Sequence, residues 1–286
     1  MALSSMLVVT VIAVAVGFVG TCALCLDRGR VRHTVAARRG RVRELAPYVG
    51  AAGFFLLAKF LTSEYSVRLS QRIGWNITDE IYAVEGEFVA VLQRVVPDVT
   101  VEVFSALYMF GFPYLLATAP ILYVTMSSLR RFKELLVAYL LNYVVGGVAL
   151  YTLFIAYGPR NHLDSVEGLM YDFYPQTQDL TAAIADNTNV FPSLHTSLSV
   201  VVLLFAWRTR REFPKWFVLA AILVSGVVFS TMYLGIHWAI DVVAGIVLAL
   251  WSVAAAEYIV GSIEGERDRR SVERSSEFAT DPETGD

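Results

Sequence analysis

Long apolar runs separated by short polar segments dominate this sequence. A helix of about 20 apolar residues crosses a bilayer core of about 30 Å. Seven runs approach this length: residues 6–26, 47–61, 101–126, 135–157, 191–207, 216–234 and 238–260. The second run is the shortest and contains Lys59, which makes it the weakest candidate. The pattern predicts an all-α, polytopic membrane helix bundle with about seven transmembrane helices.

Residues 62–99, between the second and third runs, combine apolar and acidic positions instead. Apolar side chains recur there at intervals of four and three, at Ile77, Ile81, Val84, Phe88, Val91 and Val95. Acidic residues lie between them. We therefore expect one amphipathic helix that lies on the membrane surface or caps the bundle.

Positive charge is distributed unevenly among the segments that connect the runs. If the N-terminus lies outside, the inner segments are residues 27–46, 127–134, 208–215 and 261–286, and they hold 18 of the 23 Lys and Arg residues. Cytoplasmic loops of membrane proteins carry such an excess of basic residues. We therefore expect the N-terminus outside and the C-terminus in the cytoplasm.

Composition excludes several classes of protein. With 56% hydrophobic and 17% charged residues, the chain is too apolar for a soluble domain. The net charge is −3, and no basic cluster alternates with aromatic residues, so we expect no nucleic-acid partner. Cys22 and Cys25 lie within an apolar run, where a thiol acts as a small apolar side chain. Residues 1–260 should form a single transmembrane domain, and the charged residues 261–286 a disordered tail.

Ionisable side chains lie at the ends of three of the predicted helices. Arg160 follows the fourth run, His195 opens the fifth, and His237 and Asp241 open the seventh. In the predicted orientation all of these are outer ends. Ionisable residues near membrane depth are expensive to place and indicate function. We expect one shared pocket with His195 and His237 within about 10 Å, because each contact to a bridging phosphate spans about 3 Å.

These residue types suit phosphoryl transfer. His237 and Asp241 are four residues apart, so on a helix they face each other. The carboxylate can then orient the ring and leave its other nitrogen as a nucleophile. His195 can protonate the leaving group. Arg160 and the helix start at Ser193 can hold phosphate oxygens. The set predicts a phosphohistidine intermediate.

Four further residues lie close in sequence to this set and are possible pocket residues: Tyr157, His162, Thr231 and Tyr233. The tyrosines, together with Trp238, are also typical of the aromatic belt at a membrane interface. We expect neither a metal ion nor a cofactor.

The three polar segments together resemble the motifs of the type 2 phosphatidic acid phosphatase superfamily, which also contains the vanadium haloperoxidases. Those motifs read Lys-x6-Arg-Pro, Pro-Ser-Gly-His and Ser-Arg-x5-His-x3-Asp. They correspond here to Arg160, residues 192–195 and residues 230–241, and the likeness covers about residues 135–260. The resemblance implies a six-helix phosphatase-type core with one extra span. It also implies roles for five residues: His237 as nucleophile, Asp241 as its orienting acid, His195 as proton donor, and Ser193 and Arg160 as phosphate ligands.

The departures from the motifs are informative. Leu153 and Thr231 replace the lysine of the first motif and the arginine of the third, Leu194 replaces the glycine of the second, and no proline follows Arg160. The strings FPSLH and STMYL-x2-H-x3-D resemble instead the branch that includes fungal inositol phosphorylceramide synthase. A phosphodiester carries one negative charge where a phosphomonoester carries nearly two, so it needs fewer cations.

These observations predict an integral membrane phosphotransferase at the outer face of the cell membrane. It would move a phospho-headgroup from a phosphodiester lipid to an alcohol acceptor, so membrane lipids are its expected partners. Hydrolysis of a lipid phosphomonoester or an isoprenoid diphosphate is an alternative. A transporter or metal-binding membrane protein, with His162, His195, His237 and Asp241 as ligands, is an alternative of another class.

Overall fold

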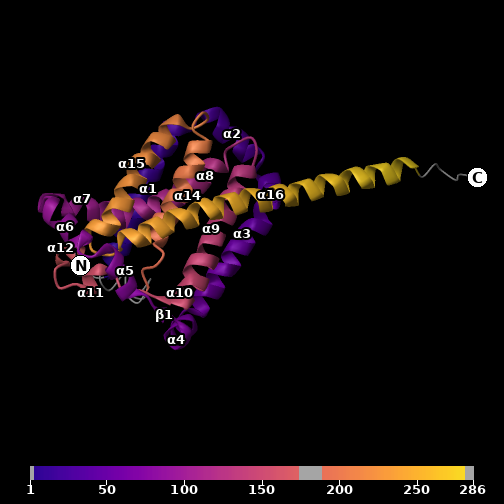
Figure 1. Ribbon diagram of the computed structural model, residues 1–286. Helices are drawn as coiled ribbons and strands as arrows, with labels where there is room; N and C mark the ends of the chain where they lie inside the picture. Colours follow the sequence, from indigo (N-terminus) through magenta and orange to yellow (C-terminus); the bar gives the residue numbers. More distant parts are fainter. Residues whose placement is uncertain (1–2, 174–188, 281–286) are drawn as a thin grey trace, which may run out of the picture.

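The structure is a computed structural model, which describes residues 3–173 and 189–280 (Figure 1). Its longer helices are α1 (Leu3–Cys25), α3 (Arg38–Leu61), α8 (Phe112–Tyr123), α9 (Arg130–Asn142), α14 (Leu194–Arg208), α15 (Pro214–Tyr233) and α16 (Ala239–Thr280). Its shorter helices are α2 (Arg28–Ala36), α4 (Ser63–Ile73), α5 (Thr78–Glu85), α6 (Phe88–Val95), α7 (Val101–Ala106), α10 (Tyr151–Leu153), α11 (Pro159–His162) and α12 (Leu169–Phe173). A 3₁₀ turn η1 (Asp98–Thr100), two π-helical segments, η2 (Leu107–Gly111) and η3 (Tyr143–Leu150), and two short strands, β1 (Trp75–Asn76) and β2 (Phe154–Ile155), complete the described part.

The helices confirm an all-α, polytopic membrane bundle. In the described residues, six segments are long and apolar enough to cross a membrane: Val8–Cys25, Arg38–Leu61, Asp98–Tyr123, Arg130–Leu153, Pro214–Tyr233 and Ala239–Glu266. The predicted fifth span, α14, is apolar but has 15 residues. The third and fourth spans are each continuous through a π-helical segment.

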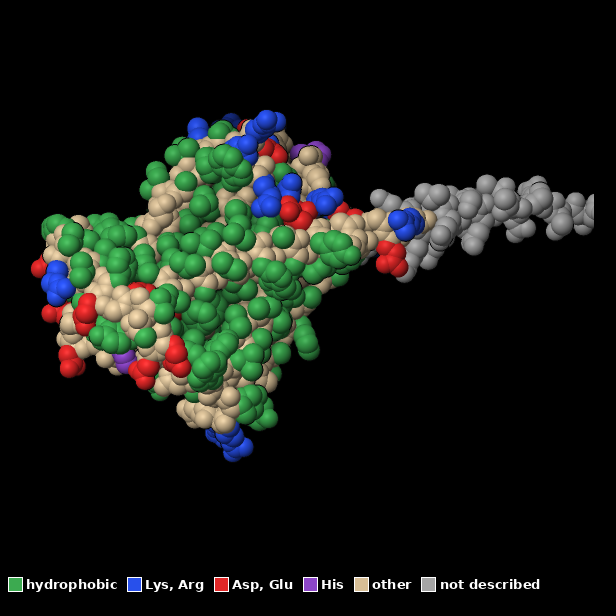
Figure 2. Space-filling view, viewed as in Figure 1, with side chains coloured by type: hydrophobic (Ala, Val, Ile, Leu, Met, Phe, Trp, Pro, Cys, Tyr) green, Lys and Arg blue, Asp and Glu red, His purple; other side chains and the backbone are tan. Residues whose placement is uncertain are grey.

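Helix α14, which is shorter than the six segments above, lies in the middle of the bundle (Figure 1). It packs against α8, α9, α15 and α16, and its side chains Leu198, Val201 and Phe205 are fully buried. Helices α1 and α3 have the opposite pattern, since Phe54 and Phe60 of α3 are about three-quarters exposed. Figure 2 shows hydrophobic side chains over the flank of the bundle. An apolar outer surface around an apolar core is the pattern of a membrane-embedded protein.

Ion pairs gather at the end of the bundle that carries α2. The Lys133 ammonium lies 2.7 Å from Glu44 of α3 and 2.8 Å from Glu264 of α16. The buried Glu134 carboxylate accepts hydrogen bonds of 2.7 Å from Arg130 and from Arg131. Because their partners neutralise them, these charges can be buried, and they join α3, α9 and α16.

The amphipathic segment is not the single helix that its periodicity predicts. It breaks into α5 and α6 at Gly86, whose φ is 57°. Only glycine adopts this left-handed conformation without strain. The break allows the two helices to pack on different parts of the bundle, since α5 contacts α16 and α6 contacts α15.

The predicted disordered tail is also different in the structure. Helix α16 continues through Thr280 and extends beyond the bundle (Figure 1). The sequence contains neither proline nor glycine from residue 266 to residue 280, so nothing in it interrupts a helix once α16 has begun. Residues 281–286 lie outside the described part.

A small extended layer connects the amphipathic segment to the end of the fourth span. Strands β1 and β2 pair in parallel, with Trp75 opposite Phe154. Ala156 continues this layer by pairing with Asn189, and the Val190 N–H donates to the Ala156 carbonyl at 3.1 Å. The layer therefore holds the entry to α14, where His195 lies.

Candidate active site

His237 and Asp241 form a buried pair where α15 passes into α16. Gly235, with φ at 72°, turns the chain, and the His237 N–H donates to the Thr231 carbonyl at 2.9 Å. His237 Nδ1 lies 3.3 Å from Asp241 Oδ2, and the same oxygen accepts the Trp238 N–H at 2.9 Å. The carboxylate thus caps α16 and orients the imidazole, which leaves His237 Nε2 as the nitrogen that can attack.

His195 lies close to this pair at the start of α14. Its ring centroid is 6.1 Å from that of His237, inside the distance that a shared phosphate allows. The His195 ring stacks on Tyr108, at 4.6 Å and an interplanar angle of 27°, and contacts Phe112 at 4.4 Å. The structure therefore brings together one histidine at the start of α14 and one in the turn between α15 and α16.

Arg160 supplies positive charge on the same side. Its backbone N–H donates to the Gly235 carbonyl at 3.2 Å, which fixes α11 against the turn before His237. Its guanidinium lies 4.5 Å from the ring centroid of Tyr171. Burial is the main cause that lowers the pKa of His237 to about 3, and the positive charge of Arg160 lowers it further. A hydrogen bond with the Val190 backbone acts in the opposite direction and raises this pKa. His237 is therefore neutral at physiological pH.

Ser193 lies within the site but performs a structural task. Its Oγ accepts the Thr196 N–H at 3.2 Å and caps α14, and its own N–H donates to the Asp241 carbonyl at 3.1 Å. The close approach of α14 and α16 depends on Gly245, because a Cβ there would lie 2.6 Å from the Ser193 carbonyl oxygen. The Ser193 hydroxyl proton can still be donated to a phosphate.

The four possible pocket residues are mainly structural. Tyr157 accepts the Trp238 indole N–H with its carbonyl at 2.8 Å. His162 lies 3.7 Å from Asp79 on the exposed side of α11. Thr231 and Tyr233 are fully buried. The Thr231 hydroxyl donates to the Val228 carbonyl at 2.7 Å. The Tyr233 hydroxyl donates to the Pro97 carbonyl at 3.3 Å. Tyr233 and Trp238 are therefore core residues and not members of an aromatic belt.

Three residues at the site were not predicted from the sequence: Glu85, Tyr108 and Phe112. The two carboxylate oxygens of Glu85 accept the N–H groups of Ala239 and Ile240 at 2.8 and 3.0 Å. Glu85 thereby holds the start of α16 next to the catalytic pair. In the sequence Glu85 is one of several acidic residues of the amphipathic segment, and its partner could not be found there.

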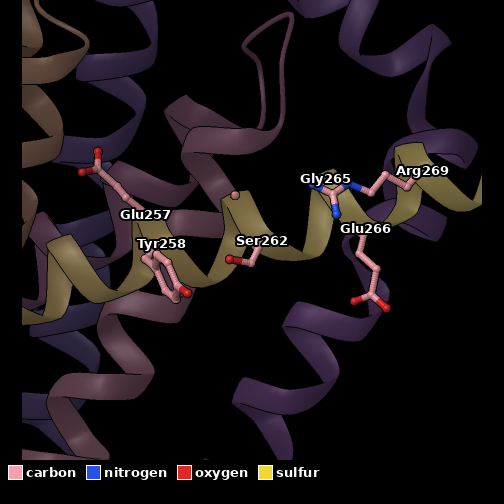
Figure 3. A pocket seen from close by; sticks show the side chains of 7 residues that line it. Glu257, Tyr258, Ser262, Gly265, Glu266 and Arg269 are labelled. Carbon is pink, nitrogen blue, oxygen red and sulfur yellow. The ribbon is translucent and has the colours of Figure 1, made fainter.

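A hollow further along α16 lies away from this site (Figure 3). It is lined by Glu257, Tyr258, Gly261, Ser262, Gly265, Glu266 and Arg269. At about 1.5 Å per residue, Glu257 lies about 24 Å along the helix from Asp241. Glu257 pairs with Arg131 and Arg208, each at 3.0 Å, and Figure 3 shows Glu257 and Glu266 pointing to opposite sides of the helix. The side chains do not converge.

Comparison with known proteins identifies the family. The model of the PAP2 superfamily matches residues 83–255, more than half of the chain. The chain belongs to the PAP2 superfamily. It is therefore an enzyme of the phosphatase and phosphotransferase type, embedded in a membrane. No curated protein and no solved structure matches the chain.

The matched range begins well before residue 135, the start of the region expected to carry the catalytic residues. Within the described residues, no group of three or more His, Cys, Asp or Glu side chains is arranged to hold a metal ion. The two histidines, Asp241 and Arg160 form the candidate site, because His195 and Asp241 both lie next to His237 and Arg160 contacts the turn before it.

Proposed function

We propose that this PAP2 enzyme is a lipid phosphotransferase that moves a phospho-headgroup from a phosphodiester lipid to an alcohol acceptor. The observation that carries the proposal is the charge of the site. Of the three cationic positions in the family motifs, Arg160 alone is basic in this chain, since Leu153 and Thr231 replace the other two. The buried Thr231 hydroxyl is occupied by a carbonyl of its own helix. One cation suits a singly charged diester better than a monoester dianion.

The geometry supports a two-step mechanism. In the first step neutral His237 attacks phosphorus with Nε2, the bond from phosphorus to the donor oxygen breaks, and His195 gives that oxygen its proton. Asp241 accepts a hydrogen bond from the Nδ1–H group of His237 and stabilises the positive charge that develops on the ring. In the second step His195 takes the proton of the acceptor alcohol, whose oxygen attacks phosphorus and releases His237.

Two features support the assignment of His237 as nucleophile and His195 as acid. The Asp241 carboxylate lies against His237, at 3.3 Å from Nδ1, as an orienting acid requires. His195 lies half-buried at the start of α14, where a leaving oxygen can reach it. Both residues also match the histidine positions of the family motifs.

We further propose that the reaction takes place at the outer face of the cell membrane. The site lies at the end of the bundle opposite α2 (Figure 1), which belongs to the arginine-rich segment 27–46. Positive charge marks the cytoplasmic side. This orientation places the N-terminus outside and α16 leading into the cytoplasm, and makes outer-leaflet lipids the substrates.

Product analysis tests the proposal. Purified protein in nanodiscs is given phosphodiester lipids, phosphomonoester lipids and an isoprenoid diphosphate, each with and without a lipid alcohol, and the products are identified by mass. Transfer from a diester to the alcohol is expected. Release of inorganic phosphate from monoesters, with no turnover of diesters, would make the enzyme a phosphatase.

Two variants make this test specific. His237→Ala should abolish turnover and any acid-labile phosphoenzyme. His33→Ala, at an exposed histidine of α2, is the matched control and should be fully active. Activity of His237→Ala equal to that of the unmodified protein would refute the mechanism.

A further inference from the structure

The third span reaches the site through an irregular segment of helix. In η2 the Phe112 N–H donates to the Leu107 carbonyl, five residues earlier. A π-turn of this kind adds one residue to the helical turn and is frequent at functional sites. Tyr108 and Phe112, four residues apart in this segment, both contact the ring of His195.

These two rings are the support of His195. Among the described residues no hydrogen bond reaches the His195 imidazole, so its contacts are the rings of Tyr108, Phe112 and His237. The other catalytic histidine differs, because Asp241 orients it. An acid that must deliver a proton along one direction needs an orienting contact, and here stacking provides it.

Tyr108 has a second property. It is 7% exposed, and in the part of the chain that the structure describes its hydroxyl has no hydrogen-bond partner. The phenol also interacts electrostatically with Arg160 and with Tyr171, so it lies on the side of the pocket that holds the cation. No protein group in the described residues satisfies this hydroxyl, so it is available to a ligand in the pocket.

We propose that Tyr108 performs two tasks at this site: its ring, together with that of Phe112, positions His195, and its hydroxyl donates a hydrogen bond to a phosphate oxygen. The proposal rests on the function proposed above. A neutral donor in place of a lysine or arginine binds phosphate without adding charge, so it selects a singly charged phosphodiester. Tyr108 is then a specificity-determining residue, and Phe112 is a positioning residue.

Variants separate the two tasks. Tyr108→Phe keeps the ring and removes the hydroxyl, whereas Tyr108→Leu removes both and Phe112→Leu removes only the second ring. Met109→Leu, a conservative change in the same π-helical segment, is the matched control for disturbance of η2. Each variant is assayed with diesters whose leaving groups differ in pKa, and for inhibition by inorganic phosphate.

The hydroxyl should affect phosphodiesters alike, whatever their leaving group. Loss of one hydrogen bond to a charged phosphate is expected to lower kcat/KM about 10- to 160-fold in Tyr108→Phe. It should weaken inhibition by phosphate and leave the dependence on leaving-group pKa unchanged. Unchanged phosphate inhibition in Tyr108→Phe would overturn the phosphate contact.

The rings should affect poor leaving groups selectively. General acid catalysis contributes about 10²- to 10⁴-fold, so Tyr108→Leu and Phe112→Leu are expected to lose a further 10-fold or more with poor leaving groups and little with activated ones. A loss of the same size for all leaving groups would overturn the positioning role.

A measurement that needs no substrate completes the test. In protein labelled with ¹³C at histidine Cε1, ring currents from Tyr108 and Phe112 should shift the His195 Hε1 signal upfield, with the signal assigned by His195→Gln. The shift should persist in Tyr108→Phe and decrease in Tyr108→Leu. A His195 signal that does not move in Tyr108→Leu would overturn the stacking. If it moves as expected but the unmodified protein transfers nothing from diesters, the proposed function fails while the positioning of His195 stands.

Discussion

Replacement of Asp241 by Asn separates the charge of this residue from its hydrogen bonds. Asp241 Oδ2 accepts from both Trp238 and His237, whereas Oδ1 is buried and has no hydrogen-bond partner in the described residues. Asparagine has nearly the same shape. Its one oxygen can take the place of Oδ2, and its NH₂ group then lies where Oδ1 lay.

Activity should fall steeply in Asp241→Asn because a neutral amide cannot stabilise the positive charge that forms on His237. In the Ser-His-Asp triad of serine proteases, the same exchange costs about 10⁴-fold in kcat. We expect a loss of about 10²- to 10⁴-fold here, which corresponds to about 3 to 5.5 kcal/mol in the activation free energy.

Stability should respond differently. The substitution removes a buried charge, which is costly in an apolar interior, and keeps both hydrogen bonds of the oxygen. The free energy of unfolding is therefore expected to stay within about 1 kcal/mol of that of the unmodified protein or to rise. Asp241→Ala loses the cap on Trp238 as well and should be less stable by about 0.5–2 kcal/mol.

The assay compares single-turnover rates of phosphoenzyme formation with thermal unfolding in nanodiscs, for the unmodified protein and both variants. An inactive Asp241→Asn protein of unchanged stability is the expected result. Rates within threefold of the unmodified protein would refute the role of the charge. An Asp241→Asn protein as unstable as Asp241→Ala would refute the interpretation of Oδ2 as the oxygen that makes both contacts.

Three further substitutions or conditions test the surroundings of the site. Gly245→Ala should separate α16 from α14, because its Cβ would lie 2.6 Å from the Ser193 carbonyl oxygen. The free energy of unfolding should fall by about 1–3 kcal/mol, and activity should fall with it. An unchanged melting temperature would contradict this. Glu85→Ala removes two hydrogen bonds from the start of α16, at Ala239 and Ile240. The variant should form the phosphoenzyme more slowly and melt at a lower temperature. An unchanged rate would show that the site does not depend on this cap. The pKa of His237 is lowered to about 3 from an ordinary 6.5, so below pH 6.5 the unfolded chain takes up a proton that the folded chain does not. The contribution of His237 to stability therefore falls as the pH decreases from 6.5 to 3. The melting temperatures of the unmodified protein and of His237→Gln should converge in acid, and a gain in stability of the unmodified protein relative to the variant would contradict the sign.

Sequence reasoning selected His195 and His237 as candidates because their chemistry conflicts with their surroundings. An aspartate one turn inside an apolar run requires a partner, and the spacing of four residues identifies His237 as that partner. Charge bias then assigned His195 and Arg160 to the same side. Local spacing and charge thus predicted one shared pocket without knowledge of helix packing, and the structure places the two histidine rings 6.1 Å apart.

The residues that hold the site could not be found in this way. Tyr108 and Phe112 lie in a continuously apolar run, where no periodicity marks the inward face, and the π-turn between them changes the phase of the helix. Glu85 was visible only as one of several acidic residues in an amphipathic segment. Its importance depends on the packing of α5 against α16, which is a tertiary contact. Tyr233 and Trp238 were misread as belt aromatics for the same reason.

These supporting residues bear on the extent of the catalytic unit. The polar residues proposed to perform the chemistry lie between Arg160 and Asp241. Glu85 nevertheless holds the start of α16, and Tyr108 stacks on His195. A fragment that begins at residue 135 would contain every motif and lack both supports. The family match begins at residue 83, just before α5 delivers Glu85, so the matched range contains the structural parts that the chemistry needs. Helices α1 and α3 precede the matched range, yet α1 packs against η2 and α8, the segment that carries Tyr108 and Phe112. The first span therefore contacts the support of His195 although the family match does not include it.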